Sequence, residues 1–389
     1  MKNNKELIPK YIFKKNQYCN FTLSGYEYKG LNIFICGQNG FWFILKNEQL
    51  NLLEQIYSGN LISSSSMKLE KMISGMPQVP PMKKFDAEDY VINEIQIEEM
   101  NFEQLQFVFK QHFSLRSFFT DSCSIGMMFY NSLSNVQSVI SLSEQYNFQD
   151  IFGEFDINFF QQNQTLPIEI NKLCSIHIHN SNYKKDVNLI KSVRKQYSGE
   201  LIIHLSDFSL IEKYTELCLE LKAYLVFEYT DNYKYIMDYI NFVNDNQRNW
   251  PYNLLKYSRI DIFKDQVLRS QYVSNCNLGY NEIYIDKKLD LYACISCKLQ
   301  KYKVIGNLLC DNLLDLWKNS PSLQYMRSLN VQMFEECRYC DFRYLCGGQC
   351  RLKAYKSTNS ILKTVPYCES MKRVMLDSIF NKYQCMISK

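Results

Sequence analysis

The sequence predicts an α/β protein in which strands and helices alternate along the middle of the chain. Short apolar runs of strand length recur between about residues 90 and 265, and stretches with helical periodicity separate several of them. Such alternation implies parallel strands joined by right-handed crossovers, and about six strands suffice for a partial (β/α)6 barrel. A dense group of cysteines follows and indicates a different kind of domain near the C-terminus.

Residues 1–89 are expected to form a small leading module and a linker. The strand-like runs are residues 11–13, 31–35 and 40–44. A short helix follows at residues 50–57, and Gly59 ends it. Residues 75–81 are rich in glycine and proline, which is typical of a linker and places the domain boundary near residue 90.

Residues 90–265 carry the alternating pattern. The expected strands are residues 91–97, 115–119, 176–179, 201–205, 223–229 and 259–263. The expected helices are residues 102–112, 187–197, 210–221 and 233–243. In barrels of this kind the chemistry is carried by residues at the carboxyl ends of the strands.

Composition bounds the class of protein. A chain of 389 residues with 46% apolar residues can form two or three domains with buried cores. The net charge of +4 is small and no block of lysine or arginine stands out, so we expect neither a nucleic-acid nor a membrane partner. No apolar run approaches the roughly 18 residues of a membrane span, and no apolar segment follows the first residues. We therefore expect a cytoplasmic protein whose fifteen cysteines are metal ligands or buried thiols.

The C-terminal cysteines have the spacing of a metal-cluster module. Residues 337–350 read C-x2-C-x5-C-x3-C, and three further cysteines flank them. Thiolates select zinc, copper(I) or iron–sulfur clusters. Gly347 and Gly348 allow the backbone to turn tightly around an inorganic core. The seven cysteines are Cys276, Cys294, Cys337, Cys340, Cys346, Cys350 and Cys368.

This spacing resembles the SPASM domain of radical SAM peptide and protein maturases. Residues 305–307 and 313–317 are similar to the family's "GN…L..W" segment, and residues 345–348 to its "CGG" turn. One position departs from the pattern, because Leu289 stands where the family has glycine. The resemblance assigns residues 266–389 to a SPASM domain with a C-terminal helix. It also implies that residues 90–265 form a radical-SAM-like barrel.

The resemblance further implies two auxiliary 4Fe–4S clusters. Cys337, Cys340, Cys346 and Cys368 would hold the second cluster. Cys276, Cys294 and Cys350 would hold the first, and Cys297 could supply its fourth thiolate. The alternative is structural zinc in an all-cysteine tetrahedron, since C-x2-C is equally a zinc spacing.

The cysteines of a catalytic radical SAM core are missing. Members of the family carry C-x3-C-x2-C after the first barrel strand, and this triad occurs nowhere in the chain. If the first strand ends near Ile97, the following residues 98–101 contain no cysteine. If residues 115–120 form that strand, Cys123 stands alone, with Met127 and Tyr130 in the other two places. The barrel is then degenerate, and we do not expect S-adenosylmethionine to bind.

The chain therefore resembles the pseudo-radical-SAM proteins of ribosomal peptide maturation systems. The implied role is accessory: binding a precursor peptide or an active maturase. An active enzyme with unusual cluster ligands and a structural zinc scaffold are the alternatives. Many related maturases carry an N-terminal peptide-binding module, and residues 10–60 are either such a module or an ordinary small domain. In the first case the edges at residues 31–35 and 41–44 are candidate peptide contacts, with Ile33 and Ile35 as the test positions. The hairpin region at residues 276–297 is the second candidate.

Three histidines and the isolated cysteines complete the candidates. His177 and His179 should lie on one face of a strand, opposite Ile176 and Ile178, with His204 in a neighbouring run. A metal pair is conceivable there, although polar positions on a half-buried strand are the simpler interpretation. The isolated cysteines are read as small buried hydrophobic residues, namely Cys19, Cys36, Cys123, Cys174, Cys218, Cys310 and Cys385.

Overall fold

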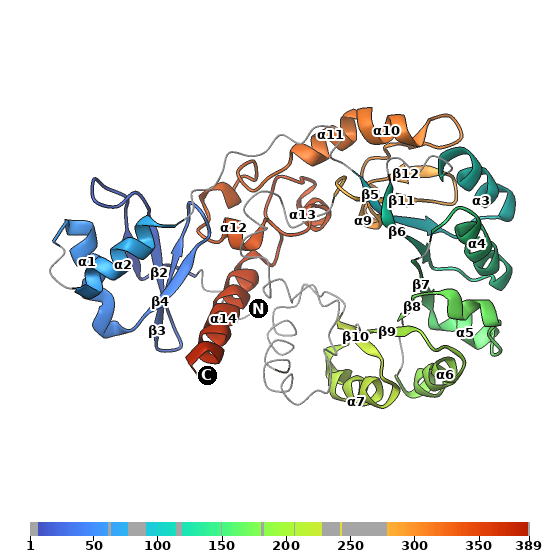
Figure 1. Cartoon of the computed structure of the whole chain (residues 1–389), viewed down its shortest axis with the longest axis horizontal. Coiled ribbons are helices and arrows are strands. Elements are labelled where there is room, and N and C mark those ends of the chain that lie inside the picture. The colour runs from blue at the N-terminus through green and yellow to red at the C-terminus, as the bar shows by residue number, and fades with distance from the viewer. Residues whose placement is uncertain are drawn as a thin grey trace.

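A computed structural model gives the fold of the chain. It describes residues 7–60, 64–76, 91–113, 119–148, 150–179, 183–205, 207–227, 242 and 278–387. These residues contain a four-stranded sheet in the order β1-β2-β3-β4 and a nine-stranded sheet in the order β10-β9-β8-β7-β6-β5-β11-β12-β13. The small sheet lies at one end of the molecule, the curved large sheet at the other, and the C-terminal segments between them (Figure 1).

The leading module is an antiparallel sheet covered by two helices. Its elements are β1 (Tyr11–Phe13), β2 (Leu23–Tyr28), β3 (Leu31–Cys36), β4 (Trp42–Leu45), α1 (Leu50–Ser58) and α2 (Ser64–Ser74). Helix α1 ends at Gly59, whose φ of 77° is the left-handed conformation that glycine adopts without steric cost. The predicted strands and helix at these positions are confirmed, whereas β2 and α2 were not predicted.

Strand β3 is buried on both faces of the small sheet. Phe34 and Cys36 pack with α1 and α2, whereas Ile33 and Ile35, one residue out of phase, belong to the core shared with the C-terminal segments. Strand β3 also pairs with β2 on one side and β4 on the other. The prediction that Ile33 and Ile35 lie at a free edge is therefore wrong: both side chains are fully buried in a central strand. Of the two edges predicted, only β4 lies at the border of the sheet.

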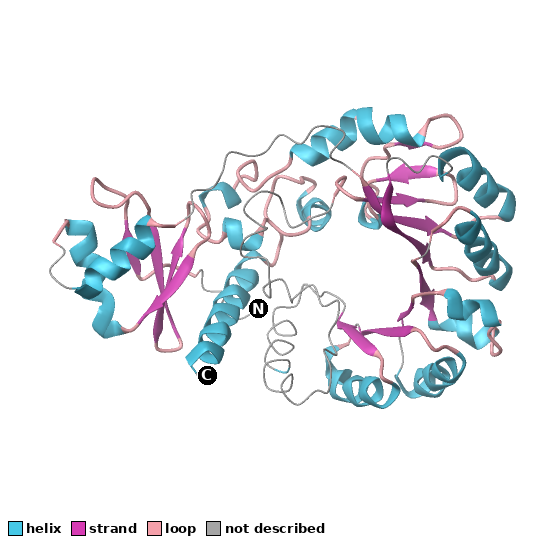
Figure 2. Ribbon diagram, viewed as in Figure 1, coloured by secondary structure: helices cyan, strands magenta, loops and turns pink. Residues whose placement is uncertain are grey.

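Six parallel strands in sequence order form most of the large sheet. They are β5 (Ile92–Glu98), β6 (Phe119–Met128), β7 (Ile151–Asp156), β8 (Ser175–His179), β9 (Glu200–Leu205) and β10 (Tyr224–Phe227). The connecting helices are α3 (Phe102–Val108), α4 (Leu133–Gln145), α5 (Ile157–Gln162), α6 (Tyr183–Gln196) and α7 (Ile211–Leu221). These helices cover the convex side of the sheet (Figure 2). The predicted α/β class with a parallel sheet is confirmed.

Strand β6 differs most from the sequence prediction. The strand expected at residues 115–119 instead begins at Phe119 and runs for ten residues to Met128. Polar residues such as Ser122 and Ser124 interrupt its apolar pattern, which is why the sequence suggests a loop there. Cys123 therefore lies inside a strand and is buried, not on a loop at a strand end. The expected strand at residues 259–263 lies outside the described residues, as does the helix at residues 233–243 except for Phe242.

The C-terminal segments continue the large sheet and then become largely helical. Strand β11 pairs in parallel with β5, so the last three strands extend the same sheet. The strands are β11 (Glu282–Ile285), β12 (Asp290–Tyr292) and β13 (Gly306–Asn307). The helices are α9 (Ile295–Leu299), α10 (Leu313–Asn319), α11 (Pro321–Ser328), η9 (Cys337–Tyr339), α12 (Arg343–Cys346), α13 (Arg351–Thr358) and α14 (Cys368–Ile387). Within the described part of the chain, no helix combines the length and apolar character needed to cross a bilayer.

Candidate metal centre

Four of the predicted thiol ligands are positioned by the ends of helices, two of them short. Cys337 begins η9 and Cys340 follows its last residue, Cys346 ends α12, and Cys368 begins α14. We call these four residues the four-thiol group. Helix ends place backbone N–H and C=O groups without intrahelical partners beside each sulfur, which is typical of sites that hold charged groups.

The electrostatics of the four-thiol group indicate that its members lie close together. Burial, with smaller contributions from the nearby thiols of Cys337 and Cys340, raises the pKa of Cys346 to about 11. Burial likewise raises the pKa of Cys368 to about 12, with added contributions from Cys346 and Cys340. Burial also raises the pKa of Cys337 to about 11. Each thiol thus raises the pKa of at least one neighbour. A bound metal cation would favour the thiolate forms and offset this rise.

The turn after α12 shapes the wall of this group. Gly347, Gly348 and Gln349 have φ values of 61°, 78° and 60°, three consecutive residues in the left-handed region. A Cβ on Gly348 would lie 2.5 Å from the ring of Phe334, so the glycine is required by space as well as by conformation. The side chain of Gln349 then turns back and its Nε2 donates to Cys346 Sγ at 3.5 Å.

The side chain of Arg351 supports this turn. Its buried guanidinium lies 4.0 Å from the centre of the Phe334 ring and donates through Nη1 to the carbonyl oxygens of Ile361 and Lys363, at 3.1 and 2.9 Å. Its charge also counteracts the rise in the pKa of Cys337 that burial causes. The cation therefore both supports the loop and favours the thiolate form of a candidate ligand.

The donor set suits a soft metal group. Four thiols, a glycine turn that excludes a Cβ and a donor to one sulfur are features expected around thiolate-bound iron–sulfur clusters. A single zinc ion would hold its sulfurs about 3.8 Å apart, given Zn–S bonds of about 2.3 Å in a tetrahedron. Among the described residues no three His, Cys, Asp or Glu side chains are arranged to hold a single ion. The four thiols are thus candidate ligands for an iron–sulfur cluster, with structural zinc as the alternative.

The second predicted thiol set is only partly described. Cys294 Sγ and Cys297 Sγ lie 3.8 Å apart, and hydrogen bonding to Cys297 together with burial raises the pKa of Cys294. Cys276 lies outside the described residues. Cys350 caps the N-terminus of α13, and Tyr355 of that helix contacts Tyr302, which follows α9, with ring centres 4.9 Å apart. The helix that carries Cys350 therefore packs beside the segment that carries Cys297.

Radical SAM enzymes carry their catalytic cysteines after the first barrel strand. At the carboxyl end of β5 in this chain, two carboxylates instead make contacts with neighbouring elements. Glu98, the last residue of β5, accepts from the backbone N–H of Lys287 at 3.2 Å and pairs with Lys298 Nζ at 3.6 Å. Glu99 accepts from the backbone N–H groups of Ser132 and Asn131, at 2.8 and 3.0 Å, just before α4 begins. Both side chains tie this strand end to neighbouring elements.

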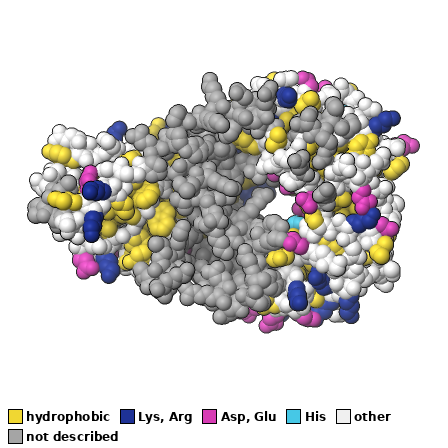
Figure 3. Space-filling model, in the orientation of Figure 1, with side chains coloured by type: hydrophobic (Ala, Val, Ile, Leu, Met, Phe, Trp, Pro, Cys, Tyr) yellow, Lys and Arg dark blue, Asp and Glu magenta, His cyan; other side chains and the backbone are white. Residues whose placement is uncertain are grey.

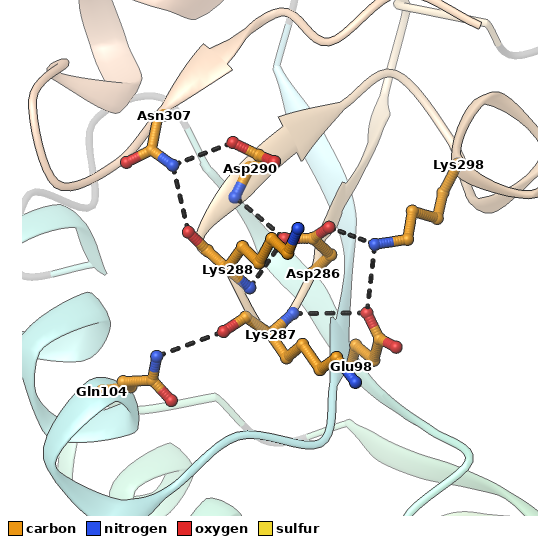
Figure 4. Close-up of polar contacts among 8 residues, drawn as sticks. All are labelled: Glu98, Gln104, Asp286, Lys287, Lys288, Asp290, Lys298 and Asn307. Carbon is orange, nitrogen blue, oxygen red and sulfur yellow. Dashed lines mark hydrogen bonds and ion pairs between the residues drawn. The ribbon is translucent and has the colours of Figure 1, made fainter. Parts of the chain in front are cut away.

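Lys298 links the strand end to the β11–β12 hairpin. It lies between Glu98 and the buried carboxylate of Asp286, and forms an ion pair with each (Figure 4). The nearby turn is held by Asn307, whose Nδ2 donates to Lys288 O and Asp290 Oδ1, and by Gln104, whose Nε2 donates to Lys287 O. Sequence reasoning missed this network, because its members are charged residues with no spacing motif that joins them.

The hairpin turn explains the one departure from the family pattern. Leu289 has a φ of 64°, in the left-handed region that glycine adopts freely. Asp286 Oδ1 accepts from the backbone N–H groups of Lys288 and Asp290, at 2.8 and 3.0 Å, and holds the turn closed. A non-glycine residue in this conformation costs about 1–2 kcal/mol. Leu289 is buried, and burying a leucine side chain contributes about 1.5–3 kcal/mol, enough to offset that cost.

Comparisons with known proteins identify distant relatives by sequence. No family model matches the chain. Cysteine-type anaerobic sulfatase-maturating enzymes of two Clostridium perfringens strains are 23% and 24% identical over 215 residues. An uncharacterized protein of Archaeoglobus fulgidus is 38% identical over 56 residues. The chain spans about half the length of the sulfatase-maturating enzymes (53%) and 14% of the Archaeoglobus protein.

Solved structures define the class of fold. The crystal structure of Streptococcus suis SuiB aligns with a TM-score of 0.50 at 11% identity, covering 88% of this chain and 97% of that one. Structures of SuiB bound to S-adenosylmethionine and to precursor peptide SuiA align with TM-scores of 0.47 and 0.49. The chain thus has a mixed α/β fold with a parallel sheet similar to that of SuiB. This likeness and the maturase relatives support the radical SAM/SPASM resemblance seen in the sequence.

Proposed function

We propose that this protein is a non-catalytic member of the radical SAM/SPASM class with an accessory role in peptide maturation. It holds auxiliary iron–sulfur clusters in its C-terminal region and binds a precursor peptide or an active maturase. One observation carries the proposal: the loop after β5 has no thiol. Its two carboxylates, Glu98 and Glu99, are engaged with Lys298 and with the start of α4.

The four-thiol group is the principal cluster site in this proposal, and Cys294, Cys297, Cys276 and Cys350 form the other. A bound 4Fe–4S cluster would supply an electron-transfer site and bind the C-terminal segments together. The protein's own residues contribute the thiolates, the turn at Gly348 and the cation of Arg351. The curated relatives, which mature sulfatases by name, support a role in processing a polypeptide substrate.

Strand β4 is the proposed place for a peptide to bind. Within the described residues it pairs with β3 alone and forms the border of the sheet, so an added strand would extend the sheet there. Cys36 N donates to Phe41 O, and antiparallel bonds alternate, so the backbone groups of Trp42 and Ile44 point away from β3. Main-chain bonds from these two residues would provide affinity.

The test is an anaerobic binding assay with the precursor peptide and the maturase encoded beside this protein. Ile44→Lys places a charge on the proposed edge, and Ile12→Lys places the same charge on β1, the opposite edge of the same sheet. We expect Ile44→Lys to weaken binding about tenfold or more and Ile12→Lys to leave it unchanged. Iron content should match the wild type in both variants, and the melting temperature of each is measured because Ile44, unlike the exposed Ile12, also packs against the core. If neither the peptide nor the maturase binds at micromolar concentrations, the accessory role is wrong.

A further inference from the structure

Three of the four histidines of the chain gather on the concave face of the large sheet. His177 and His179 lie in β8 and His204 lies beside them in β9, where His179 and His204 are paired in register. Ile176 and Ile178 point to the opposite face and are fully buried, as predicted from the alternation. The space-filling view shows a histidine side chain beside the hollow of the molecule (Figure 3). This group lies apart from the cysteines of the C-terminal region.

The side chains of this group are in direct contact. His177 Nδ1 lies 3.0 Å from His204 Nε2, and the rings of His179 and His204 stack with their centres 4.0 Å apart. His179 Nε2 lies 3.3 Å from Glu154 Oε2 on the adjacent strand β7. At the other nitrogen of the His177 ring, Ser175 Oγ lies 3.3 Å from Nε2. Three imidazoles, a carboxylate and a hydroxyl thus occupy three neighbouring strands.

The separation of the two nitrogens has a chemical consequence. Zinc binds histidine nitrogens at about 2.0–2.1 Å. The two nitrogens are 3.0 Å apart, so one ion can lie within bonding distance of both. Metal-binding histidines usually pass their second ring N–H to a nearby acceptor, and Ser175 is placed to accept from His177 Nε2. Burial lowers the pKa of His177 to about 4 and that of His204 to about 2, so both imidazoles are neutral near pH 7.

We propose that His177 and His204 chelate a divalent transition metal ion, with zinc as the reference case, on the concave face of the sheet. The ion lies to one side of the line that joins the two nitrogens, after both rings tilt toward it, and the hydrogen bond between them is lost. As the side chains lie, no three His, Cys, Asp or Glu residues of the described chain converge on one point. The third ligand is therefore His179 or Glu154 after a side-chain rotation, and water completes the set. Imidazole and carboxylate donors suit zinc, nickel or cobalt, in contrast to the all-thiolate set at the C-terminus.

The experiment uses the full chain after anaerobic reconstitution with iron and sulfide, so that the thiols are occupied. One equivalent of Zn²⁺ is added, its affinity is measured by competition with a chromophoric chelator, and its ligands are read by zinc-edge X-ray absorption. We expect one zinc per chain with a nitrogen and oxygen shell at about 2.0–2.1 Å, distinct from the roughly 2.3 Å of thiolate. His204→Phe removes a metal ligand but keeps an aromatic ring against His179. It should weaken zinc binding about 100-fold or more, because loss of a ligand costs more than loss of a residue that only hydrogen-bonds to one.

His112→Gln is the matched control, because His112 is the fourth histidine and contacts Leu308 O, away from the concave face. It should bind zinc as the wild type does. His177→Asn is the second test variant if His204→Phe melts at a lower temperature. A wild-type zinc shell of sulfur alone, or full affinity in a folded His204→Phe or His177→Asn variant, overturns the proposal. Iron content reports on the cysteine sites separately and should be equal in all four proteins.

Discussion

Cys337 and Cys340 are the residues of the four-thiol group whose loss is simplest to interpret. Both lie at η9, outside the large sheet; Cys337 belongs to the buried core and Cys340 packs against it, but both side chains are small, so alanine removes the thiols with little loss of packed volume. We expect Cys337→Ala combined with Cys340→Ala to lower the iron content of anaerobically reconstituted protein from about eight to about four per chain. Loss of the cluster should also lower the melting temperature, because metal binding contributes folding free energy.

The control for this pair is Cys218→Ala. Cys218 is buried in α7 and far from the cysteine-rich segment in sequence, so it should leave iron and acid-labile sulfide unchanged. Iron and sulfide assays on the three proteins decide the question. Stoichiometric zinc without sulfide in the wild type would show instead that the site is structural zinc.

Gly348 offers a second prediction at the scale of one residue. Gly348 and Gly30 have nearly the same φ, 78° and 79°, but a Cβ on Gly348 would meet Phe334 whereas a Cβ on Gly30 would have no neighbour within 4 Å. Gly30→Ala should therefore cost only the left-handed conformation, about 1 kcal/mol in the free energy of unfolding. Gly348→Ala should cost at least twice as much and should also reduce iron content. Equal melting temperatures for the two variants would contradict this account.

At the scale of elements, the docking of the leading module onto the C-terminal region depends on a few polar contacts. Tyr26 of β2 donates to Asp341 Oδ2 at 2.9 Å, immediately beside Cys340. Lys29, in the turn before β3, pairs with Asp377 of α14 at 2.6 Å. The small sheet therefore contacts the helices that carry candidate cluster ligands, so a partner bound to the sheet is mechanically linked to that region.

The Lys29–Asp377 pair can be tested by removing each partner in turn. Asp377 is buried while Lys29 is about half exposed, so Lys29→Met leaves a buried carboxylate without its cation. We expect this change to cost about 1–3 kcal/mol in the free energy of unfolding, and more than Asp377→Asn. Lys10→Met, which removes an exposed pair with Glu27, is the control and should have no measurable effect. Denaturant unfolding and limited proteolysis between the two regions would reveal the difference, and a smaller loss for Lys29→Met than for Asp377→Asn would refute it.

The sequence was most informative where local patterns determine the structure. Runs of alternating or continuous apolar residues predicted β3, β5, β8 and β9, and the C-terminal cysteine spacing predicted a compact thiol group. The sequence was least informative where tertiary contacts decide the outcome. Strand β6 is stabilised by pairing on both sides despite its polar residues, and the edge status of β3 depends on β2, which the pattern did not reveal. The Glu98–Lys298 contact joins residues 200 positions apart, and neither it nor the Asp286–Lys298 contact has a local signature.

At the scale of the whole molecule, the proposed role requires that the large sheet perform no radical chemistry. Reductive cleavage of S-adenosylmethionine by radical SAM enzymes needs a cluster with an open iron at the carboxyl end of the first parallel strand. Here that strand is β5, and its end is tied by Glu98 and Lys298 to the β11–β12 hairpin. Cys123, the cysteine nearest in sequence, is buried within β6 and has no second thiol at family spacing.

Reduced, fully reconstituted protein incubated with S-adenosylmethionine should therefore form no 5′-deoxyadenosine above a no-protein background. The matched samples are Cys123→Ala and the Cys337→Ala, Cys340→Ala double variant, which remove the one thiol near the barrel start and part of the four-thiol group. All three proteins should give the same background, because the sequence contains no C-x3-C-x2-C triad. Cleavage by the wild type that disappears in Cys123→Ala would place a catalytic cluster at β6. Cleavage that disappears only in the double variant would place it at the C-terminal cysteines, and the protein would then act as an enzyme in its own right.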